Sequence, residues 1–472
     1  MSLLDRPEAK LLLKDAEVSA AVVRGCRQRL TGYLQRYLPR FARVEQRGHA
    51  RLVVAGRLTR LERKTSEPIA RQAGVERHPV QVFVGAGKWD DEAVMAELRS
   101  HVAEAFADPD TTFVLDGSGF PKKGTASCGV QRQWCGRLGK VDNCQVGVFL
   151  SGVSQGRIGP LHRRLYLPRD WASDRKRRLK CHVPSDVRFA EKWLIGLKLI
   201  RASRDVPHGW IVADDEYGRV GEFRARLRKW KERYVLDVPC NTLVRVEEPA
   251  SAAKSSRSRS APARRGRPRK PAWVRVDEWA AAPPAARWRR IEVRPGEKGP
   301  LIVEVLTAPV QTRDHSRERL LVIRTVEAAP KTHYCLSNAA ASVAVEELVW
   351  AHDDRHRVEE MFELGNGEVG LDHYEVRSWV GWHHHMTLSL LALWFLVLER
   401  QRVGKKTPAI TVPQVRDLFS QLLQHPATTP ERIADTLTNV LRRNEEARIY
   451  HWYTTTETFP PRRTLVLTIN SS

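Results

Sequence analysis

The segment from His352 to Asn366 carries the residue types and spacing best suited to phosphoryl-transfer chemistry. At about 100° per residue, four side chains of a helix here would fall within roughly 60° of one another on a single face: His352, Arg355, Glu359 and Asn366. Glu360 would point about 80° away from His352, on the opposite side from the other members. Of the two adjacent glutamates, therefore, only Glu359 lies on this face. A carboxylate and an arginine on one face can hold a divalent cation and a phosphate group, respectively.

Two aspartates upstream make this pattern more specific. Asp116 ends the apolar run Thr111–Leu115, and Asp214 ends the run Trp210–Ala213. A single aspartate at a strand end is usually an ordinary turn or cap residue. Two at strand ends followed by one glutamate on a helix predict a site for two divalent cations. Carboxylate oxygens suit Mg²⁺, and Mn²⁺ can substitute for it. Two ions about 4 Å apart can activate a water or a 3′-hydroxyl and stabilise the leaving oxygen.

The charge of the chain indicates a polyanionic partner. Lysine and arginine total 79 against 55 acidic residues, which gives a formal net charge of +24. Such a field attracts nucleic acid and predicts steeply salt-dependent binding. Membrane surfaces are not expected as partners, because the chain has no amphipathic basic helix of the required kind and its longest apolar block, Met386–Leu398, is too short to span a bilayer.

The cysteines predict no disulfide framework and no zinc site. All seven are scattered and none forms a Cys-x-x-Cys pair, which is typical of structural thiols in a reducing compartment. We therefore expect an intracellular protein.

The hydrophobic patterns predict a mixed α/β chain. Strands are expected near residues 111–116, 144–153, 164–167, 210–213 and 234–239, with the first three antiparallel to one another in part. Helices are expected near residues 91–102 after the N-cap Asp90, then near 187–202, 221–232, 383–402, 413–424 and from 430 onward. The tail at 464–470 has the composition of a strand.

These patterns divide the chain into five segments. We expect a basic helical N-terminal DNA-binding domain at 1–108, the first part of a catalytic core at 109–246, a basic linker with a β-rich insertion at 247–330, the second part of the core with Glu359 at 331–402, and a helical C-terminal region at 403–472. The basic residues of the first segment either contact DNA or form a solvated face. They are Arg40, Arg43, Arg47, Arg57, Arg60, Arg63 and Lys64.

The linker contains Arg265-Gly-Arg267, which resembles an extended hook for a narrow A·T-rich minor groove. A charged loop that contacts phosphates without sequence preference is the alternative interpretation. In either case Arg265 and Arg267 are predicted DNA contacts.

Several motifs together resemble the insertion-sequence transposases of the DDE superfamily. The segments that carry the resemblance are Leu115–Gly124, Gly139–Val148, Ala213–Gly218, Val358–Phe362, Gly370–Arg377 and Gly381–Leu388. The resemblance covers residues 30 to 400. It implies an RNase H-like mixed five-stranded sheet with flanking helices and a β-rich insertion before the catalytic glutamate.

The same resemblance implies the chemistry of the site. Asp116, Asp214 and Glu359 are its expected catalytic residues and metal ligands, and Arg355 is expected to contact phosphate. Two Mg²⁺ ions would serve cleavage of double-stranded DNA at the element's terminal inverted repeats and joining of the freed 3′-hydroxyl to target DNA. The synaptic complex would contain a homodimer.

The second aspartate has a rival in Asp215. In the resembling enzymes the catalytic aspartate lies three residues before a Tyr-Gly pair, which favours Asp214, and strand alternation allows only one of the two neighbours to face the metals.

Two positions depart from the family's tyrosine–arginine–glutamate–lysine signature. His352 stands at the tyrosine position and Asn366 at the lysine position. Asparagine can hydrogen-bond phosphate but has no charge. Three explanations remain open: Lys122 or Lys123 supplies the cation, strand transfer proceeds differently, or catalysis is impaired. The corresponding alternatives for function are a transposase-derived DNA-binding protein and an RNase H-like nuclease that does not transpose.

Three tryptophans and three consecutive histidines are further candidate functional residues. Trp273, Trp279 and Trp288 are expected either to pack in a core or to stack on a flipped-out base. His383, His384 and His385 diverge by about 100° per residue on a helix, so they cannot bind one ion, and we expect them near DNA phosphates or solvent.

Overall fold

The computed structural model describes residues 2–247, 272–296, 299–327, 329–425 and 427–463. These residues form two compact units. The first comprises Met1–His208, Glu297–Gly299 and His356–Ser472, and the second comprises Gly209–Gly296 and Pro300–Arg355. The predicted minor-groove hook at Arg265 and Arg267 and the predicted C-terminal strand lie outside the described residues.

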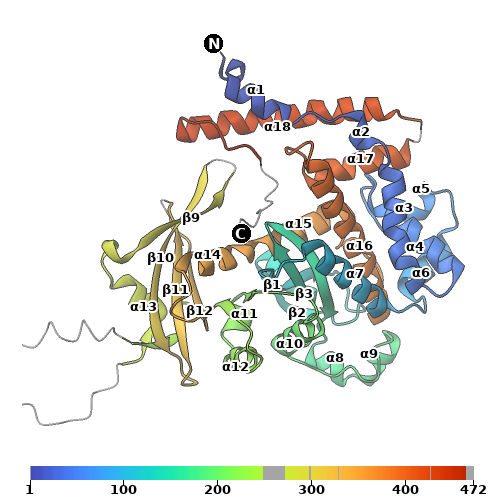
Figure 1. Ribbon diagram of the computed structural model, residues 1–472. Coiled ribbons are helices and arrows are strands. Elements are labelled where there is room, and N and C mark those ends of the chain that lie inside the picture. The colour runs from blue at the N-terminus through green and yellow to red at the C-terminus, as the bar shows by residue number, and fades with distance from the viewer. Residues whose placement is uncertain (1, 248–271, 297–298, 328, 426, 464–472) are drawn as a thin grey trace, which may run out of the picture. The chain divides into compact units, whose positions relative to one another are not determined.

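The first unit begins with a series of helices (Figure 1). They are α1 (Pro7–Lys14), α2 (Ala20–Val23), α3 (Cys26–Tyr37), α4 (Val44–Arg57), α5 (Ser66–Gln72), α6 (Arg77–Gly85) and α7 (Asp91–Phe106). Asp90 is the N-cap of α7, as predicted, because its carboxylate accepts hydrogen bonds from the backbone N–H groups of Glu92 and Ala93.

An antiparallel sheet follows in the same unit. Its strands are β1 (Thr112–Pro121), β2 (Gln131–Cys135), β3 (Lys140–Ser154) and β4 (Arg157–Leu165). The long strand β3 pairs with β1 along one edge, and with β2 and then β4 along the other. The antiparallel arrangement predicted for this region is confirmed. Asp116 lies in the middle of β1, opposite Phe149, so the expectation that it ends its strand is wrong.

Helices pack around this sheet and fill the rest of the unit. They are α8 (Arg169–Ser173), α9 (Arg175–Lys180), α10 (Lys192–Ala202), α15 (His356–Val369), α16 (Trp379–Gly404), α17 (Val412–Gln424) and α18 (Pro430–Thr456). Nearly the whole N-terminal half of α16 is buried, and this helix contacts β4, α4, α6, α7, α15 and α17. Its apolar sequence is therefore explained by a central position in the core. Among the described residues, no helix combines the length and apolar character needed to cross a membrane.

The second unit contains a mixed sheet. β5 (Trp210–Ala213) and β6 (Tyr234–Asp237) are parallel and are connected through α11 (Asp215–Gly218) and α12 (Gly221–Lys229). The remaining strands are antiparallel to their neighbours: β7 (Leu243–Val246), β8 (Val274–Arg275), β9 (Arg289–Pro295), β10 (Pro300–Gln311), β11 (Arg317–Thr325) and β12 (Thr332–Ser337).

The connection between β6 and the next long helix is thus β-rich, as predicted. β12 returns to pair with β6, which joins the insertion strands to the parallel pair. An apolar core lies on this sheet with α13 (Val276–Ala281), and Trp279 and Trp288 pack against it. Core packing is therefore the confirmed interpretation for these two tryptophans.

α14 (Val345–Asp354) completes the second unit and corrects one expectation. The segment from His352 to Asn366 is not one helix, because α14 ends at Asp354, Arg355 is its C-cap, and α15 begins at His356. The common face predicted for the whole segment therefore applies only to residues on the same helix, such as Glu359 and Asn366.

The fold class is the one expected from the sequence. The chain is α/β, with a mixed sheet, flanking helices and a helical N-terminal region, which is consistent with the RNase H-like fold that the sequence motifs implied.

Candidate active site

Asp214 is placed by the end of a buried strand. All four residues of β5 are buried, and the chain then turns into α11 with Asp214 as the N-cap. Its carboxylate Oδ1 accepts a hydrogen bond from the backbone N–H of Glu216 at 3.0 Å. This arrangement fixes the carboxylate at the strand end, where the sequence predicted it.

The surroundings of Asp214 are rich in negative charge. Burial raises the pKa of Asp214 to about 6, and the carboxylates of Glu216 and Asp215 add to this effect, whereas the guanidinium of Arg355 opposes it. Asp215 differs from Asp214 because its carboxylate forms an ion pair with Arg219 at 2.6 Å on the surface. Asp214, whose pKa is raised, is therefore the neighbour that would gain more from a bound cation.

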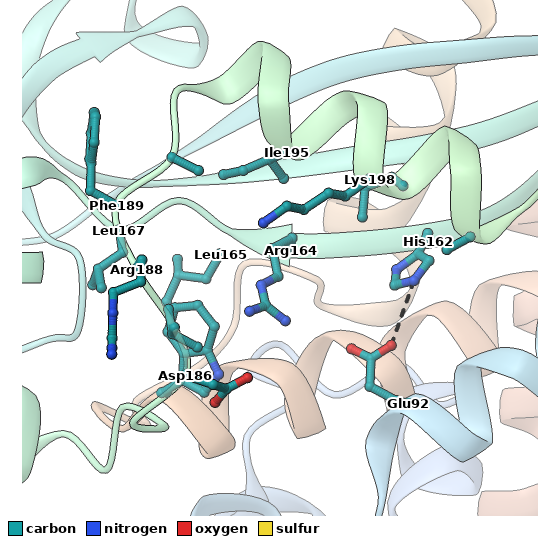
Figure 2. A pocket seen from close by; sticks show the side chains of 15 residues that line it. Glu92, His162, Arg164, Leu165, Leu167, Asp186, Arg188, Phe189, Ile195 and Lys198 are labelled. Atoms are coloured by element: carbon teal, nitrogen blue, oxygen red, sulfur yellow. Dashed lines mark ion pairs between the residues drawn. The ribbon is translucent and has the colours of Figure 1, made fainter. Parts of the chain in front are cut away.

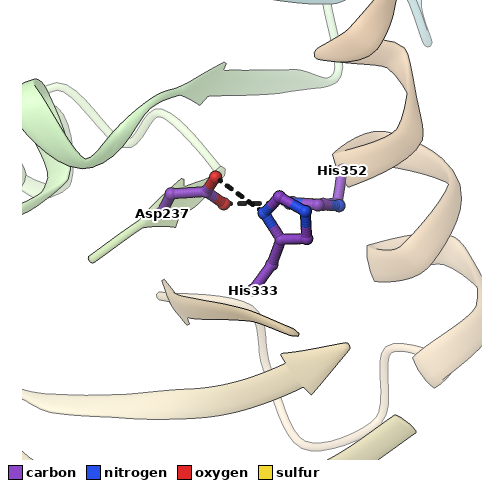
Figure 3. A group of neighbouring side chains, drawn as sticks. All are labelled: Asp237, His333 and His352. Carbon is purple, nitrogen blue, oxygen red and sulfur yellow. Dashed lines mark hydrogen bonds and ion pairs between the residues drawn. The ribbon is translucent and has the colours of Figure 1, made fainter. Parts of the chain in front are cut away.

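Asp237 is a further acidic residue of this region that the sequence reasoning missed. It is the last residue of β6 and is 7% exposed. Arg355 Nε lies 3.3 Å from Asp237 Oδ2, and His352 Nε2 lies 2.9 Å from Oδ1. The Asp237 carboxylate thus contacts both His352 of α14 (Figure 3) and Arg355, the C-cap residue of that helix, and the sequence had singled out both. The signal was present, because Tyr234-Val-Leu-Asp237 is another short apolar run that ends in a carboxylate.

Asp214, Asp237 and Arg355 line one cavity of about 310 Å³ in the second unit. Its walls are formed by the strand ends of β5, β6 and β12 and by the end of α14. The lining residues are Asp214, Asp215, Asp237, Val238, Pro239, Cys240, Thr332, His333, Tyr334 and Arg355. The cavity combines carboxylates that can bind a cation with an arginine that can bind phosphate.

Asp116 belongs to the first unit, and the strand register fixes its direction. Directly opposite residues of an antiparallel pair project to the same face of a sheet, so Asp116 and Phe149 share a face. The ring of Phe149 packs against Phe362 of α15, with ring centroids 5.2 Å apart. The neighbouring residue Leu115 meets Gly196 of α10 on the opposite face. The carboxylate of Asp116 therefore points to the face that α15 covers.

Glu359 lies on the first turn of that helix. Its side chain is 55% exposed, and its Oε2 atom is 3.3 Å from Nδ1 of His356. Glu360 is engaged differently, because its carboxylate forms an ion pair with Arg357 at 3.0 Å. Val358 and Met361 anchor the helix in the core of the unit, with Met361 against Ser151 of β3. The structure thus carries Asp116 and Glu359 on two elements that pack together, β1 and α15.

The remaining predicted contacts have distinct environments. Asn366 is half-buried on α15, and its Oδ1 atom has no hydrogen-bond partner among the residues that the structure describes. Lys122 Nζ donates a hydrogen bond to the carbonyl oxygen of Tyr374 and lies 3.4 Å from the centroid of its ring. Burial lowers the pKa of Lys122 to about 8. Lys123 is exposed.

For two of the N-terminal basic residues, the expectation that they contact DNA is wrong. Arg57 and Lys64 are only 1% and 2% exposed. The guanidinium of Arg57 donates to the carbonyl oxygens of Val369 and Gly370 at the end of α15. Among the others, Arg40, Arg60 and Arg63 form ion pairs with acidic residues on the surface.

The three consecutive histidines of α16 are not near solvent, so that expectation is also wrong. His383, His384 and His385 are all buried, at most 2% exposed. His384 Nε2 lies 3.1 Å from the carbonyl oxygen of Trp89, and His385 Nε2 lies 3.0 Å from that of Leu371. The three rings contact different partners, which agrees with the prediction that they cannot share one ion.

A second cavity, of about 370 Å³, lies in the first unit between β4, α10 and α16 (Figure 2). Arg164 and Lys198 line it together with apolar residues, and His162 Nε2 is 3.6 Å from Glu92 Oε2 at its edge. Burial lowers the pKa of His162 to about 4, so its ring is neutral at neutral pH. This cavity contains no residue that the sequence predicted for the site.

Comparison with known proteins provides independent information on the family. A family model described as DDE superfamily endonuclease matches residues 36–300, which include Asp116 and Asp214 and end before α14. A probable transposase for insertion sequence element IS701 from Microchaete diplosiphon is 26% identical over 218 residues. This similarity covers 45% of the chain and 54% of that protein, so the chain matches about half the length of this relative.

Proposed function

Because the chain belongs to the DDE superfamily of endonucleases, we propose that it is an insertion-sequence transposase. It cleaves double-stranded DNA at the terminal inverted repeats of its mobile element and joins the freed 3′-hydroxyl ends to target DNA. The similarity to the IS701 transposase supports this proposal over a nuclease that does not transpose. The formal charge of +24 suits a DNA substrate.

The observation that carries the proposal is the cavity at the ends of β5 and β6. Asp214 and Arg355 both line it, and these are residues to which the family resemblance assigns a metal and a phosphate. The chemistry of the donors fits a divalent cation, because burial, together with the neighbouring carboxylates of Glu216 and Asp215, raises the pKa of Asp214 to about 6. When bound, two Mg²⁺ or Mn²⁺ ions supply an activated water or 3′-hydroxyl and stabilise the leaving oxygen.

The protein's own residues have separate tasks in this proposal. Asp116, Asp214 and Glu359 hold the metals, and Glu359 is accessible for this role because its carboxylate is mostly exposed. Arg355 binds a DNA phosphate, and Asp237 orients its guanidinium. Asp237 is a positioning residue in this scheme, since it acts through Arg355.

Further DNA contacts are proposed at Asn366, which is half-buried, and at Lys123, which is exposed. Asn366 would hydrogen-bond phosphate with its amide, and Lys123 would supply a charge from the surface. The pairing of two element ends requires two active sites, so we propose a homodimer in the synaptic complex. The protein would act in the cytoplasm, at the nucleoid.

The test uses a supercoiled plasmid that carries candidate terminal repeats, incubated with the full-length protein and Mg²⁺. We expect nicking at the repeat ends, and loss of at least about 10³-fold in rate for Glu359→Gln, because a metal ligand is removed. Glu360→Gln is the matched control, since the adjacent carboxylate is similarly exposed but is paired with Arg357. It should keep nearly full activity.

The outcomes separate the candidate functions. Cleavage that survives Glu359→Gln and Asp214→Asn would overturn the catalytic assignment. Cleavage of any DNA without preference for the repeats would indicate a plain nuclease. Tight binding of the repeats without cleavage in either Mg²⁺ or Mn²⁺ would indicate a transposase-derived DNA-binding protein.

A further inference from the structure

Three side chains from separate elements of the second unit converge on one point. Asp237 comes from the end of β6, His333 from β12 and His352 from α14 (Figure 3). One potential ligand atom of each lies within 4.8 Å of the others, which makes this a group compact enough to hold a metal ion. Two imidazoles and one carboxylate form a ligand set that Zn²⁺ uses in proteins.

The distances suit a tetrahedral ion. Ligands at about 2.0–2.1 Å from Zn²⁺ are about 3.3 Å apart when the geometry is tetrahedral. His333 Nδ1 is 3.5 Å from Asp237 Oδ2, and His352 Nε2 is 2.9 Å from Oδ1. These two separations, measured to the two different oxygens of the carboxylate, lie near the required value, and one ligand atom of each residue lies within 4.8 Å of the others.

Burial and charge also favour a cation here. The Asp237 and His352 side chains are each 11% exposed, so their ligand atoms are already largely withdrawn from water. Three aspartates and one arginine line the adjoining cavity, and Asp215 among these is also paired with Arg219. The cavity keeps an excess of negative charge, which a divalent cation would offset.

The Asp237 carboxylate also contacts neighbouring side chains that are not themselves ligands, as metal-binding groups usually do. Cys335 Sγ donates to Asp237 Oδ1 at 3.1 Å, and Arg355 Nε lies 3.3 Å from Oδ2. Such contacts fix the orientation of a ligating carboxylate.

We propose that Asp237, His333 and His352 form a site for a transition-metal ion of the zinc class, separate from the Mg²⁺ ligands. Imidazole nitrogens bind Zn²⁺ and Co²⁺, whereas Mg²⁺ prefers oxygen ligands, so the two kinds of site select different ions. The bound ion would connect α14 to β6 and β12. Because Arg355 caps α14, the ion would also hold this arginine at the cavity that contains Asp214.

The first experiment measures Co²⁺ binding by the full-length protein after treatment with a chelator. We expect one equivalent of Co²⁺ with the visible absorption bands of a tetrahedral site. His333→Ala and His352→Ala should each weaken binding by more than about 100-fold, because even the loss of an outer partner costs 10–100-fold. His315→Asn is the control, since this exposed histidine of the same unit has a φ of 63°, which asparagine tolerates. It should bind as the wild type does.

A second variant distinguishes this site from the proposed catalytic metals. Asp214→Asn should keep the Co²⁺ spectrum, because Asp214 is not one of the three ligands. Loss of the spectrum in Asp214→Asn, or its persistence in both histidine variants, would overturn the proposal.

X-ray absorption spectroscopy of the wild-type protein loaded with one equivalent of Zn²⁺ tests the same point without any variant. The proposal requires two imidazole ligands in the first coordination sphere. A sphere with oxygen ligands alone, or with thiolate sulfur, would contradict it.

Discussion

Gly218 lies so close to Asp237 that a Cβ atom at position 218 would stand 1.9 Å from the Asp237 carbonyl oxygen. Gly218 is the last residue of α11, the short helix that Asp214 caps, and Asp237 ends the neighbouring strand β6. The absence of a side chain at Gly218 therefore allows the helix to approach the strand end, and this approach brings Asp214 and Asp237 into one cavity.

Gly218→Ala should destabilise the protein by about 3–5 kcal/mol, because the new methyl group collides with backbone that cannot rotate away. The measurement is the free energy of unfolding in denaturant. Gly221→Ala is the control three residues later, where the nearest atoms to an added Cβ are 4.0 Å away. That variant should be neutral or slightly more stable, since alanine favours a helix. Equal stability of the two variants would refute the close approach.

Asp214→Asn should stabilise the protein in the presence of a chelator. The pKa of Asp214 is about 6 in the folded protein, above its ordinary 3.8, so the folded state holds the proton more tightly than the unfolded state. The ionised carboxylate therefore weakens folding above about pH 6, and this penalty fades as the pH falls towards 3.8. Asparagine removes the charge and still caps α11. We expect a gain of about 1–3 kcal/mol at pH 7.5 and a smaller gain at pH 5.

The comparison for this prediction is Asp215→Asn, which removes an exposed carboxylate paired with Arg219. Its effect should remain below about 0.5 kcal/mol at both pH values. Addition of Mg²⁺ should raise the melting temperature of the wild type more than that of Asp214→Asn, because only the wild type has the complete set of carboxylates. A lower stability of Asp214→Asn in the chelator would contradict the assigned environment.

The sequence predicted the structure correctly where neighbouring residues determine it. The run Trp210–Ala213 predicted both a strand and the position of Asp214 at its end, and Asp90 predicted the start of α7. The order of strands and helices around the insertion also follows from hydrophobic periodicity, which local sequence carries.

The sequence did not predict the environment of residues whose partners come from distant segments of the chain. Arg57 appears as one of several exposed cations in its own segment, yet its partners are the carbonyl groups of Val369 and Gly370, more than 300 residues later. His384 is buried against Trp89, almost 300 residues earlier, whose ring stacks on the imidazole and whose carbonyl oxygen lies 3.1 Å from Nε2. The break between α14 and α15 at Arg355 has no proline or glycine to mark it, and Arg355 instead faces Asp237 from the preceding sheet.

Lys64→Met should stabilise the protein at neutral pH. Burial lowers the pKa of the Lys64 ammonium to about 8, and the neighbouring cation Arg416 adds to the effect. Because the folded-state pKa lies below the ordinary 10.5, keeping Lys64 charged costs folding free energy below pH 8, and the cost disappears as the pH rises from 8 past 10.5. After loss of the hydrogen bond to the Thr59 carbonyl, the net gain should be about 1–2 kcal/mol at pH 7.

The pH dependence distinguishes this effect from simple packing. The advantage of Lys64→Met over the wild type should shrink between pH 8 and pH 10, whereas Lys123→Met, at an exposed lysine, should show neither a gain nor a pH dependence. DNA affinity should be unchanged in Lys64→Met, since the buried ammonium cannot reach a phosphate. A gain that is constant from pH 7 to pH 10 would mean that the ammonium is not desolvated.

Asn366→Lys should strengthen DNA binding. Asn366 follows Glu359 by seven residues on α15, which places both on one face of the helix. A lysine there can extend its ammonium group to solvent and gain a phosphate contact beside the proposed metal ligand. One added phosphate contact should steepen the slope of log K against log salt by about 0.9. The measurement is the affinity for a terminal-repeat duplex between about 50 and 200 mM salt.

Gly367→Lys is the matched control for this prediction. It adds the same charge one residue later, at an exposed position where an added Cβ meets nothing within 4 Å, but about 100° around the helix from the face of Glu359. If the Glu359 face binds DNA, Asn366→Lys should raise affinity about fivefold or more and Gly367→Lys should raise it less. Equal increases in the two variants would mean that only the net charge of the chain matters, and that α15 does not present the Glu359 face to DNA.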